Sequence, residues 1–401
     1  MLNLLIEGWR GVNHSFALVN QCQIIELLKF DDLRLFHRDL PFAMPHWNAK
    51  TLDAGFSAAD KDRIESLMEP GARPIDCVYR ITSPFRADPA SHVRTLSFMV
   101  TELGLSERSF EPGSTQLDLY TRDANLIVTP TRWSRDRLVE HGFDADKIRV
   151  VTHGVRSDTF YPLTPEERSA NRANLGLRAD EVVFLNLGAA LWNKGIDVLL
   201  LGFARLKQQQ ASIKLILKDQ RGLYGISVEQ TVKDLSAQHP ALFNAETLAA
   251  IQVVHGNLSQ AQLRLMYGVA DCYVSPYRAE GFNLPVLEAI ACGTPAVVTE
   301  GGATDDFCTP DVAMRVASTP GTMDMPERGG VSRFCEPDPD ALVAAMKAFC
   351  TGPGIARHTF AQGRQRLVES LTWQRATREL HQLIADPFAF EKSALEQRAT
   401  A

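Results

Sequence analysis

The chain of 401 residues is long enough for two ordinary domains, and its 45% apolar and 22% charged residues are typical of a globular protein. A formal net charge of −6 argues against a nucleic-acid partner, and no basic stripe contradicts that. The longest apolar runs fall far short of the roughly 18 residues that a membrane-spanning helix needs, and Glu7 and Arg10 interrupt the N-terminus before a secretory signal forms. Seven cysteines without a C-x-x-C pair indicate reduced thiols, so we expect a cytoplasmic protein.

The first part of the chain, residues 1–160, predicts an alternation of strands and helices. Strands are expected at 2–6, 77–82, 96–101, 125–129 and 148–152, because each is a short apolar run. The first strand leads through a loop with two glycines into a helix that Ser15 is suited to cap. This opening is typical of a Rossmann-like unit, although the loop is not G-x-G-x-x-G. Helices are expected at 57–68 and 131–141, while the rest of 30–74 carries poor signals.

A proline-bearing stretch at 158–165 is interpreted as the interdomain linker, after which the α/β pattern restarts. Strands are expected at 182–187, 213–217, 251–255 and 272–274, with helices at 196–206 and 259–267. Residues 311–335 look like a loop-rich insertion, and further helices open near residues 338 and 371. We therefore predict two α/β domains, residues 1–160 and 161–375, followed by a last helix with a frayed tail at 376–401.

The most informative stretch runs from Ser275 to Val298, with the sequence SPYRAEGFNLPVLEAIACGTPAVV. It follows a predicted buried strand and contains a loop, a short helix and a second strand. Pro285 suits the first position of a helix, and Gly293 suits the residue just past its end. The helix is therefore expected to begin close to Leu284.

Two carboxylates flank the start of this helix. Glu280 lies in the loop and Glu288 in the first helical turn. The positive end of a helix binds phosphate well, and the amides expected there belong to Phe282, Asn283 and Leu284. Acids beside an anion cradle suggest a ligand that carries both hydroxyls and phosphates, such as a nucleotide sugar.

The spacing Glu280-x7-Glu288, with G-F-x-L-P between the acids and then E-A-x-A-C-G-x-P, resembles the signature of retaining glycosyltransferase family 4. Members of that family have the GT-B fold, in which two Rossmann-like domains face each other across a cleft. Acids are favoured at helix N-termini in any protein, so a lone pair of this spacing would carry little weight, but here the whole block matches. The resemblance implies that Glu280 lies beside the donor sugar and that Glu288 holds the ribose hydroxyls. It also implies that loop amides contact the donor diphosphate, at Gly281, Phe282, Asn283 and Leu284.

The resemblance is mixed in the loop after the strand at 182–187. The family usually has an Arg directly after the first glycine and a Lys before the second, and these cations clamp the diphosphate. Lys194 matches, but Ala189 stands in place of the Arg. Lys218 and Arg221, at and just beyond the end of the next strand, are the nearest candidates to replace it. Solvated cations at a strand end are the alternative interpretation for both.

In the N-terminal domain, the resemblance implies that the loop at 7–14 touches donor phosphate or acceptor. Gly11 and Val12 are the donor-binding candidates, and Arg10 and His14 are acceptor-side candidates. The plainer alternative for His14 is that it supports the start of the following helix. Glu102 is a further acceptor-side candidate, with a solvated charge at a strand end as its alternative.

The resemblance implies a retaining transfer of a hexose-type sugar from a nucleoside-diphosphate sugar to a hydroxyl of a glycan, a lipid-linked sugar or a small molecule. No metal ion or cofactor is expected, and no D-x-D pair sits where a metal would be assigned. Lys194 would stabilise the leaving diphosphate, and Glu280 would support an oxocarbenium-like state, as nucleophile or as stabiliser. Because Ala189 replaces the Arg, the alternative is a non-catalytic relative that binds a nucleotide sugar or a protein partner. The donor base, the sugar, the acceptor, a peripheral membrane contact and the oligomeric state stay open.

Overall fold

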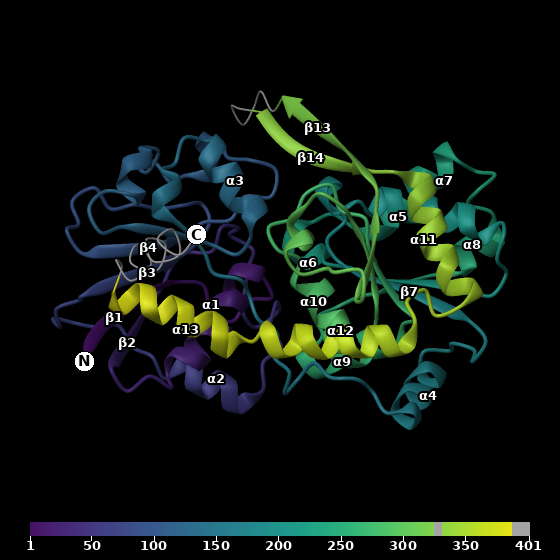
Figure 1. The fold of residues 1–401 in the computed structure, drawn as a ribbon, viewed down its shortest axis with the longest axis horizontal. Coiled ribbons are helices and arrows are strands. Elements are labelled where there is room, and N and C mark those ends of the chain that lie inside the picture. Colours follow the sequence, from purple (N-terminus) through teal and green to yellow (C-terminus); the bar gives the residue numbers. More distant parts are fainter. Residues whose placement is uncertain (325–330, 387–401) are drawn as a thin grey trace, which may run out of the picture. The chain divides into compact units, whose positions relative to one another are not determined.

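The computed structural model describes residues 1–324 and 331–386, and the chain divides into two compact units (Figure 1). Among the described residues, unit 1 comprises 1–154 and 371–386, and unit 2 comprises 155–324 and 331–370. The chain thus changes unit a few residues before each predicted boundary. Of the frayed tail predicted at the end, residues 387–401 lie outside the described residues.

A parallel sheet of six strands forms the centre of unit 1, in the order β2-β1-β3-β4-β5-β6. The strands are β1 (Leu2–Gly8), β2 (Leu33–Asp39), β3 (Cys77–Ile81), β4 (Arg94–Phe98), β5 (Leu126–Thr129) and β6 (Ile148–Val150). The helices are α1 (Ser15–Leu27), α2 (Ala58–Glu65), α3 (Arg132–Glu140) and α13 (Trp373–Ala385), and α13 packs against α1 (Figure 1). The last helix of the chain therefore completes the unit formed by its first residues.

Unit 2 contains a second parallel sheet, in the order β12-β11-β10-β7-β8-β9. The strands are β7 (Val182–Leu187), β8 (Ile213–Lys218), β9 (Ile251–Val254), β10 (Cys272–Ser275), β11 (Ala296–Thr299) and β12 (Ala313–Val316). The longer helices are α4 (Pro165–Asn174), α5 (Ile196–Lys207), α7 (Val228–Gln238), α9 (Gln260–Val269), α10 (Leu284–Ala291), α11 (Pro339–Thr351) and α12 (Arg357–Ser370). Two short helices complete the set, α6 (Arg221–Tyr224) and α8 (Ala245–Ala249). The core of this unit lies between the sheet and helices such as α5 and α11, where Phe184, Leu199 and Phe203 are fully buried.

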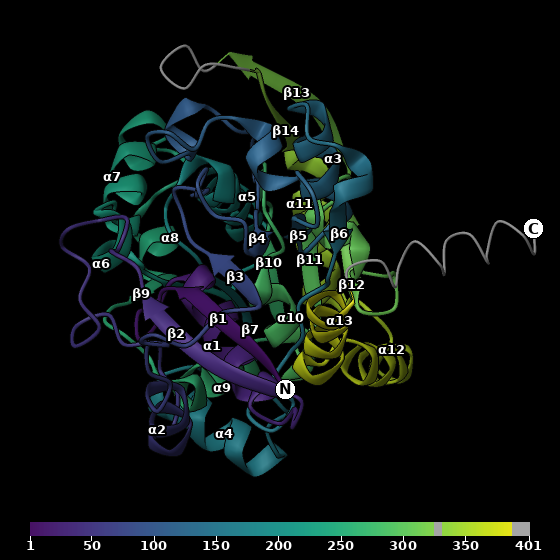
Figure 2. The same cartoon turned by 90° about the vertical axis from the view of Figure 1, so that its left-hand side faces the viewer.

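The prediction of an α/β protein with two Rossmann-like sheets is confirmed, and three local expectations are wrong. The N-cap of α1 is His14 rather than Ser15, because His14 has extended backbone angles and its ring nitrogen accepts from the amide of Phe16. Strand β2 lies in the stretch that carried poor signals. The supposed loop-rich insertion contains an antiparallel hairpin, β13 (Ser318–Asp324) with β14 (Val331–Pro337). In both views this hairpin extends from unit 2 as a two-stranded ribbon (Figures 1 and 2).

Helix α10 begins and ends where the sequence predicts. It starts at Leu284 with proline in its first turn, and Gly293 beyond its end has a φ of 90°. Its N-cap, Asn283, has a left-handed backbone with φ 76° and ψ 61°, and its side-chain amide donates to Ser275 Oγ at 2.9 Å. The strand before the loop therefore fixes the unusual turn that starts the helix. Within the described ranges 1–324 and 331–386, we find no helix long and apolar enough to cross a membrane.

Candidate functional site

The candidate site of unit 2 lies at one edge of its sheet. Strands β7, β8, β9 and β10 are parallel, so the loops that follow them emerge at the same edge, as ligand-binding loops do in folds of this kind. The loop after β7 contains the short helical turn Trp192–Lys194, and the loop after β10 leads into α10. The donor-site candidates of unit 2 lie on these two loops, at the end of β8 and in the first half of α10.

The loops after β7 and β10 are tied together by their backbones. The carbonyl of Asn193 accepts from the amides of Arg278 and Ala279, at 2.8 and 3.1 Å, and the Asn193 side chain donates to the carbonyl of Ala279 at 3.1 Å. Gly195 has a φ of 67°, and a Cβ placed on it would lie 1.9 Å from the carbonyl oxygen of Pro276. Only glycine fits this crossing, so the loop carrying Lys194 is held directly against the loop carrying Glu280.

Lys194 and Glu280 form an ion pair across this crossing. The Lys194 ammonium donates to Glu280 Oε2 at 2.7 Å, and the Glu280 side chain retains only 9% of its surface. A pair this short in a partly desolvated site is much stronger than a pair in free solvent. The structure thus joins the two residues for which the family resemblance implies catalytic roles.

Arg278, two residues before Glu280, holds the same loop in place through the hydrogen bonds of its side chain. Its guanidinium forms two hydrogen bonds of 2.8 Å with Asp197 in the first turn of α5 and bonds of 2.7 and 3.0 Å with Glu336 on β14. It also donates to the carbonyl of Trp192 at 2.9 Å and lies 4.6 Å from the centre of that ring. Burial opposes the charge of Arg278, but the two carboxylates outweigh it and raise its pKa. Arg278 therefore unites the hairpin, α5 and both loops of the site.

The N-terminus of α10 is held by aromatic packing. Phe282 stacks on Phe307, with ring centroids 4.9 Å apart and 23° between the planes. Gly281, Phe282 and Asn283 are buried, and Leu284 begins the helix. The predicted amide cradle of these four residues is thus part of a fixed turn at the positive end of a helix, the arrangement that favours an anion.

Glu288 accepts a hydrogen bond from the buried Tyr267 of α9. The Tyr267 hydroxyl lies 2.7 Å from Glu288 Oε2. Burial raises the pKa of Glu288 to about 7, although the hydrogen bond from Tyr267 acts in the opposite direction. Burial also raises the pKa of the neighbouring Tyr273; the hydrogen bond to the backbone of Leu187 opposes this rise, the charges of Glu280 and Glu288 add to it, and the charge of Lys194 opposes it. The three charged groups therefore lie around one tyrosine of β10.

Lys218 lies beside the position where the Arg is missing. It ends β8 in register with Leu187 of β7, two residues before the buried Ala189. Its ammonium donates to the carbonyl of Asp219 at 2.7 Å, and burial lowers its pKa while the carboxylate of Asp219 partly compensates. Lys218 thus places a buried cation at the sheet edge where the missing Arg was expected, but on β8 rather than after β7. Arg221 begins the short helix α6 and is exposed.

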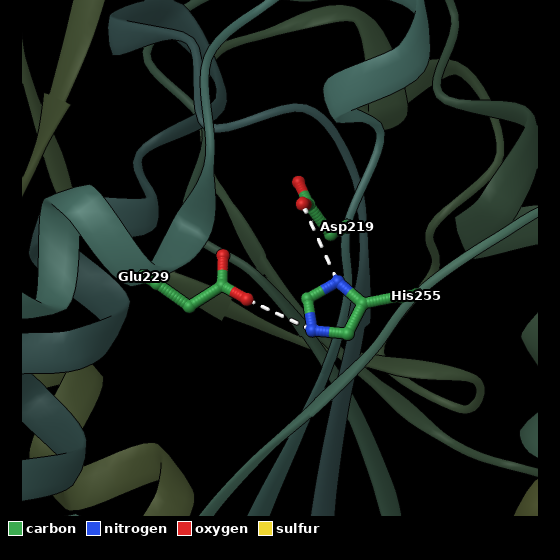
Figure 3. Close-up of side chains that lie close together, drawn as sticks. All are labelled: Asp219, Glu229 and His255. Carbon is green, nitrogen blue, oxygen red and sulfur yellow. Dashed lines mark ion pairs between the residues drawn. The ribbon is translucent and has the colours of Figure 1, made fainter.

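Three possible metal ligands gather beyond Lys218: Asp219, Glu229 and His255. His255 Nε2 lies 2.8 Å from Glu229, while Nδ1 lies 3.7 Å from the buried Asp219. Figure 3 shows that the ring sits between the acids and turns a different nitrogen to each. Because one histidine offers a metal only one of its nitrogens, this geometry is that of an imidazole bridging two carboxylates, and we assign no metal here.

The candidates of unit 1 are mostly engaged in local structure. Arg10 donates to both oxygens of Asp39, at 2.8 and 2.6 Å, and to two carbonyls of the segment that includes α2. The amide of Gly11 donates to a glutamine on α1, and Val12 is fully buried. His14 caps α1 and packs against Trp9 and Trp47, as its plainer interpretation, support of the helix start, predicts. The backbone carbonyl of Glu102 accepts a hydrogen bond from a tryptophan on α3. These contacts show where the five candidates lie, and they do not test whether any of the five binds a ligand.

The sequence analysis missed two residues that organise the site, Arg278 and Tyr267. Arg278 lies inside the quoted motif, but its partners are far away along the chain. Tyr267 precedes the motif on α9, where a tyrosine among apolar residues looks like ordinary core. A helical pattern that places its hydroxyl toward α10 was the only available signal.

Residues 167–328 match the family model of glycosyl transferases group 1. This segment belongs to that family. The group 1 segment contains Lys194, Lys218, Glu280 and Glu288 as well as the loop from Gly281 to Leu284, so the donor-site candidates of unit 2 all fall within it. The family resemblance noted in the sequence is thereby confirmed for this segment.

Among similar proteins, a D-inositol 3-phosphate glycosyltransferase from Xylanimonas cellulosilytica is 33% identical over 47% of this chain and 44% of its own length. The chain spans about half the length of the curated relatives that it matches. Two solved structures resemble nearly the whole chain. They are a glycosyltransferase from Rickettsia africae, with a TM-score of 0.69, and HepE from Anabaena in complex with UDP and glucose, with a TM-score of 0.67. Each is 14% identical and covers 96% of this chain and at least 99% of its own, so they establish the GT-B fold of the chain.

Proposed function

We propose that this protein is a retaining glycosyltransferase that moves a hexose-type sugar from a nucleoside-diphosphate sugar to a hydroxyl acceptor. The observation that carries the proposal is the Lys194–Glu280 ion pair just before α10, whose second turn carries the partly buried Glu288. A cation, an acid and a helix N-terminus together match the charges of a phosphorylated sugar. The complex of HepE with UDP and glucose is the parallel among proteins of this fold.

In the proposed reaction, the bond between the anomeric carbon and the diphosphate oxygen breaks, and the acceptor oxygen bonds to that carbon on the same face. The electron pair leaves with the diphosphate, and the acceptor proton passes to that leaving group. Lys194 and the amides from Gly281 to Leu284 stabilise the developing negative charge, which makes a metal ion unnecessary in this mechanism. Glu280 stabilises the positive charge on the sugar, and Glu288 accepts hydrogen bonds from the ribose.

Lys218 is proposed to supply the second cation of the donor site. Its buried position near Ala189 supports this role, because a desolvated ammonium gains more from an approaching phosphate than an exposed one.

Gly11 and Val12 are proposed on the donor side of unit 1, and Arg10, His14 and Glu102 on the acceptor side. We place the protein in the cytoplasm, and we propose a glycan, a lipid-linked sugar or a small molecule as the acceptor. The name of the Xylanimonas relative specifies an inositol phosphate.

The test is a thermal-shift screen with UDP, GDP and ADP sugars, followed by measurement of nucleoside diphosphate released with simple acceptors. A nucleotide sugar that binds only the folded protein raises its melting temperature. We expect Glu280→Gln to lower the release rate by about 100-fold or more without weakening nucleotide binding, and Lys194→Ala to lower both. Lys347→Ala, on the exposed side of α11, is the matched control.

The second candidate function is nucleotide-sugar binding without transfer, which the replacement of Arg by Ala189 favours. In that case a selective thermal shift appears, but no acceptor increases diphosphate release above the rate of Glu280→Gln. Absence of any shift at millimolar concentration would contradict both candidates.

A further inference from the structure

The hydrogen bond between Tyr267 and Glu288 leaves one carboxylate oxygen for a ligand. Tyr267 donates to Glu288 Oε2 at 2.7 Å, and among the described residues no hydrogen bond reaches Oε1. Oε1 is also missing from the fully buried polar atoms that lack a partner in this part of the chain, so it retains contact with solvent. The carboxylate is therefore fixed on one side and accessible on the other.

Tyr267 is itself anchored firmly enough to orient its partner. Its ring is 1% exposed and packs against Phe160 and Tyr273, with centroids at 6.1 and 5.9 Å. Its carbonyl accepts from the Thr294 hydroxyl at 2.7 Å, which links α9 to the end of α10. The hydroxyl thus has a fixed position relative to the helix that carries Glu288.

We propose that Tyr267 is a positioning residue for the donor, because its hydroxyl holds Oε2 of Glu288 in the carboxylate form and turns Oε1 toward the ribose hydroxyls. This inference rests on the proposed function, since it assigns Glu288 to the ribose. A carboxylate can accept bonds from two hydroxyls, whereas a carboxylic acid loses one acceptor to its own proton. Tyr267 thereby sets the pH range in which the donor binds.

The other groups around Glu288 do not supply this control. Apart from Tyr267, the titratable groups on the elements packed against α10 are Arg264 on α9, Cys272 and Tyr273 on β10, and Arg357, His358, Arg364, Arg366 and Glu369 on α12, with Cys292 after the end of α10 itself. Strand β11, which also packs there, is Ala-Val-Val-Thr and carries none. Only the Tyr267 hydrogen bond acts against burial on the pKa of Glu288. Removing that hydroxyl should therefore raise the pKa further.

The experiment compares the pH dependence of nucleotide-sugar binding in the wild type, Tyr267→Phe and Glu288→Gln. A nucleotide sugar is used rather than a free nucleoside diphosphate, because the terminal phosphate of the latter titrates near pH 6 and would obscure the result. Phenylalanine retains the ring packing and removes only the hydroxyl. We expect wild-type affinity to fall by up to tenfold per pH unit below a midpoint near 7, and Tyr267→Phe to move that midpoint upward by about one unit.

Glu288→Gln separates this effect from other titrations, because it should bind weakly and without that midpoint. Identical midpoints in the wild type and Tyr267→Phe would overturn the inference, even if both bind the donor. The same conclusion follows if Tyr267→Phe loses affinity equally at every pH, since that pattern reports loss of packing alone.

A second readout needs no ligand and distinguishes failure of the inference from failure of the proposed function. Carbon-detected NMR of glutamate carboxyls in the full chain follows the titration of Glu288, which is assigned by its absence in Glu288→Gln. An upward shift in Tyr267→Phe supports the control of Glu288 by the hydroxyl. If the wild type binds no nucleotide sugar at any pH, the proposed function and the donor role of Tyr267 both fall, whatever the titration shows.

Discussion

At the scale of single residues, the candidate site is built from charged groups that the fold keeps partly out of water. The charges of Glu280 and Arg278 are compensated by ion-pair partners, whereas Glu288 has only the hydroxyl of Tyr267 among the described residues. A largely desolvated acid with one neutral partner is costly when ionised. The site therefore reduces the stability of the folded protein in a way that depends on pH.

Glu288→Gln should stabilise the protein at alkaline pH. The folded-state pKa of Glu288, about 7, lies above its ordinary value of 4.5, so the wild type loses stability as pH rises through this window and the glutamine variant does not. We expect the variant's advantage in urea unfolding to grow from below about 1 kcal/mol at pH 5 to about 2–3 kcal/mol at pH 8. Glu166→Gln, in the exposed first turn of α4, is the control. An equal effect of Glu288→Gln at both pH values would contradict the prediction.

Lys218→Met should weaken donor binding without destabilising the fold. The substitution removes a buried cation, whose pKa burial already lowers, and replaces it with an apolar chain of similar length. We expect about tenfold lower affinity for the nucleotide sugar in calorimetry, with an unchanged or higher melting temperature. Lys214→Met, on the same strand but with its ammonium bonded to the carbonyl of Ala249, should change neither. Unchanged affinity in Lys218→Met would mean that the missing Arg has no substitute on β8.

At the scale of elements, the site depends on the crossing of the loops after β7 and β10. The hydrogen bonds of Asn193, the close approach at Gly195 and the guanidinium of Arg278 all act on the same few residues. Each of these contacts joins segments about eighty residues apart in sequence. A change at the crossing should therefore disturb Lys194 and Glu280 together.

Gly195→Ala tests this crossing directly. The added methyl group would meet the carbonyl of Pro276 at 1.9 Å, on a backbone with positive φ. We expect a loss of at least about 3 kcal/mol in the free energy of unfolding, or a failure to fold. Gly225→Ala has a similar φ of 74° but open space around its Cβ, so it should cost only about 1–2 kcal/mol. Equal losses in the two variants would show that the crossing does not confine Gly195.

The elements also show how far sequence reasoning reaches. The position of helix α10 was predicted because Pro285 and Gly293 mark its two ends, and most strands were predicted because they are continuous apolar runs. Strand β2 was missed because His37 and the two arginines of Leu33–Asp39 interrupt its apolar pattern, although His37 is buried. The hairpin was missed because Pro320 and Gly321 look like loop residues. At the site, local motif spacing gave Lys194, Glu280 and Glu288, whereas the partners of Arg278 depend on tertiary contacts that no local pattern records.

At the scale of the whole molecule, the charged residues of the candidate donor site all belong to one of the two units. Lys194, Lys218, Glu280 and Glu288 all lie in unit 2, which has its own six-stranded sheet and buried core. Unit 1 is completed only by α13, after the chain has finished unit 2. The continuous segment 155–370 therefore contains the whole of unit 2. A continuous segment that contains unit 1 must span nearly the full chain, because unit 1 includes both the first residues and α13.

Residues 155–370 should fold alone and retain nucleotide recognition. We expect a single cooperative thermal transition by circular dichroism and a thermal shift with the nucleotide that the full chain prefers, reduced in Glu288→Gln. Residues 1–154, which lack α13, should be markedly less stable than the same unit in the full chain. If the 155–370 segment lacks a cooperative transition, the division into units does not describe independent folding.

The Lys194–Glu280 ion pair has a consequence for turnover. In the proposed donor site, the ammonium is already neutralised before a diphosphate arrives, so the diphosphate would have to exchange places with an internal carboxylate. This competition would limit the affinity of that site for a nucleotide. For a transferase of the kind proposed, the same carboxylate reclaims the ammonium once the sugar has been transferred and helps to expel the spent nucleotide. The ion pair would then protect the enzyme from inhibition by its own product.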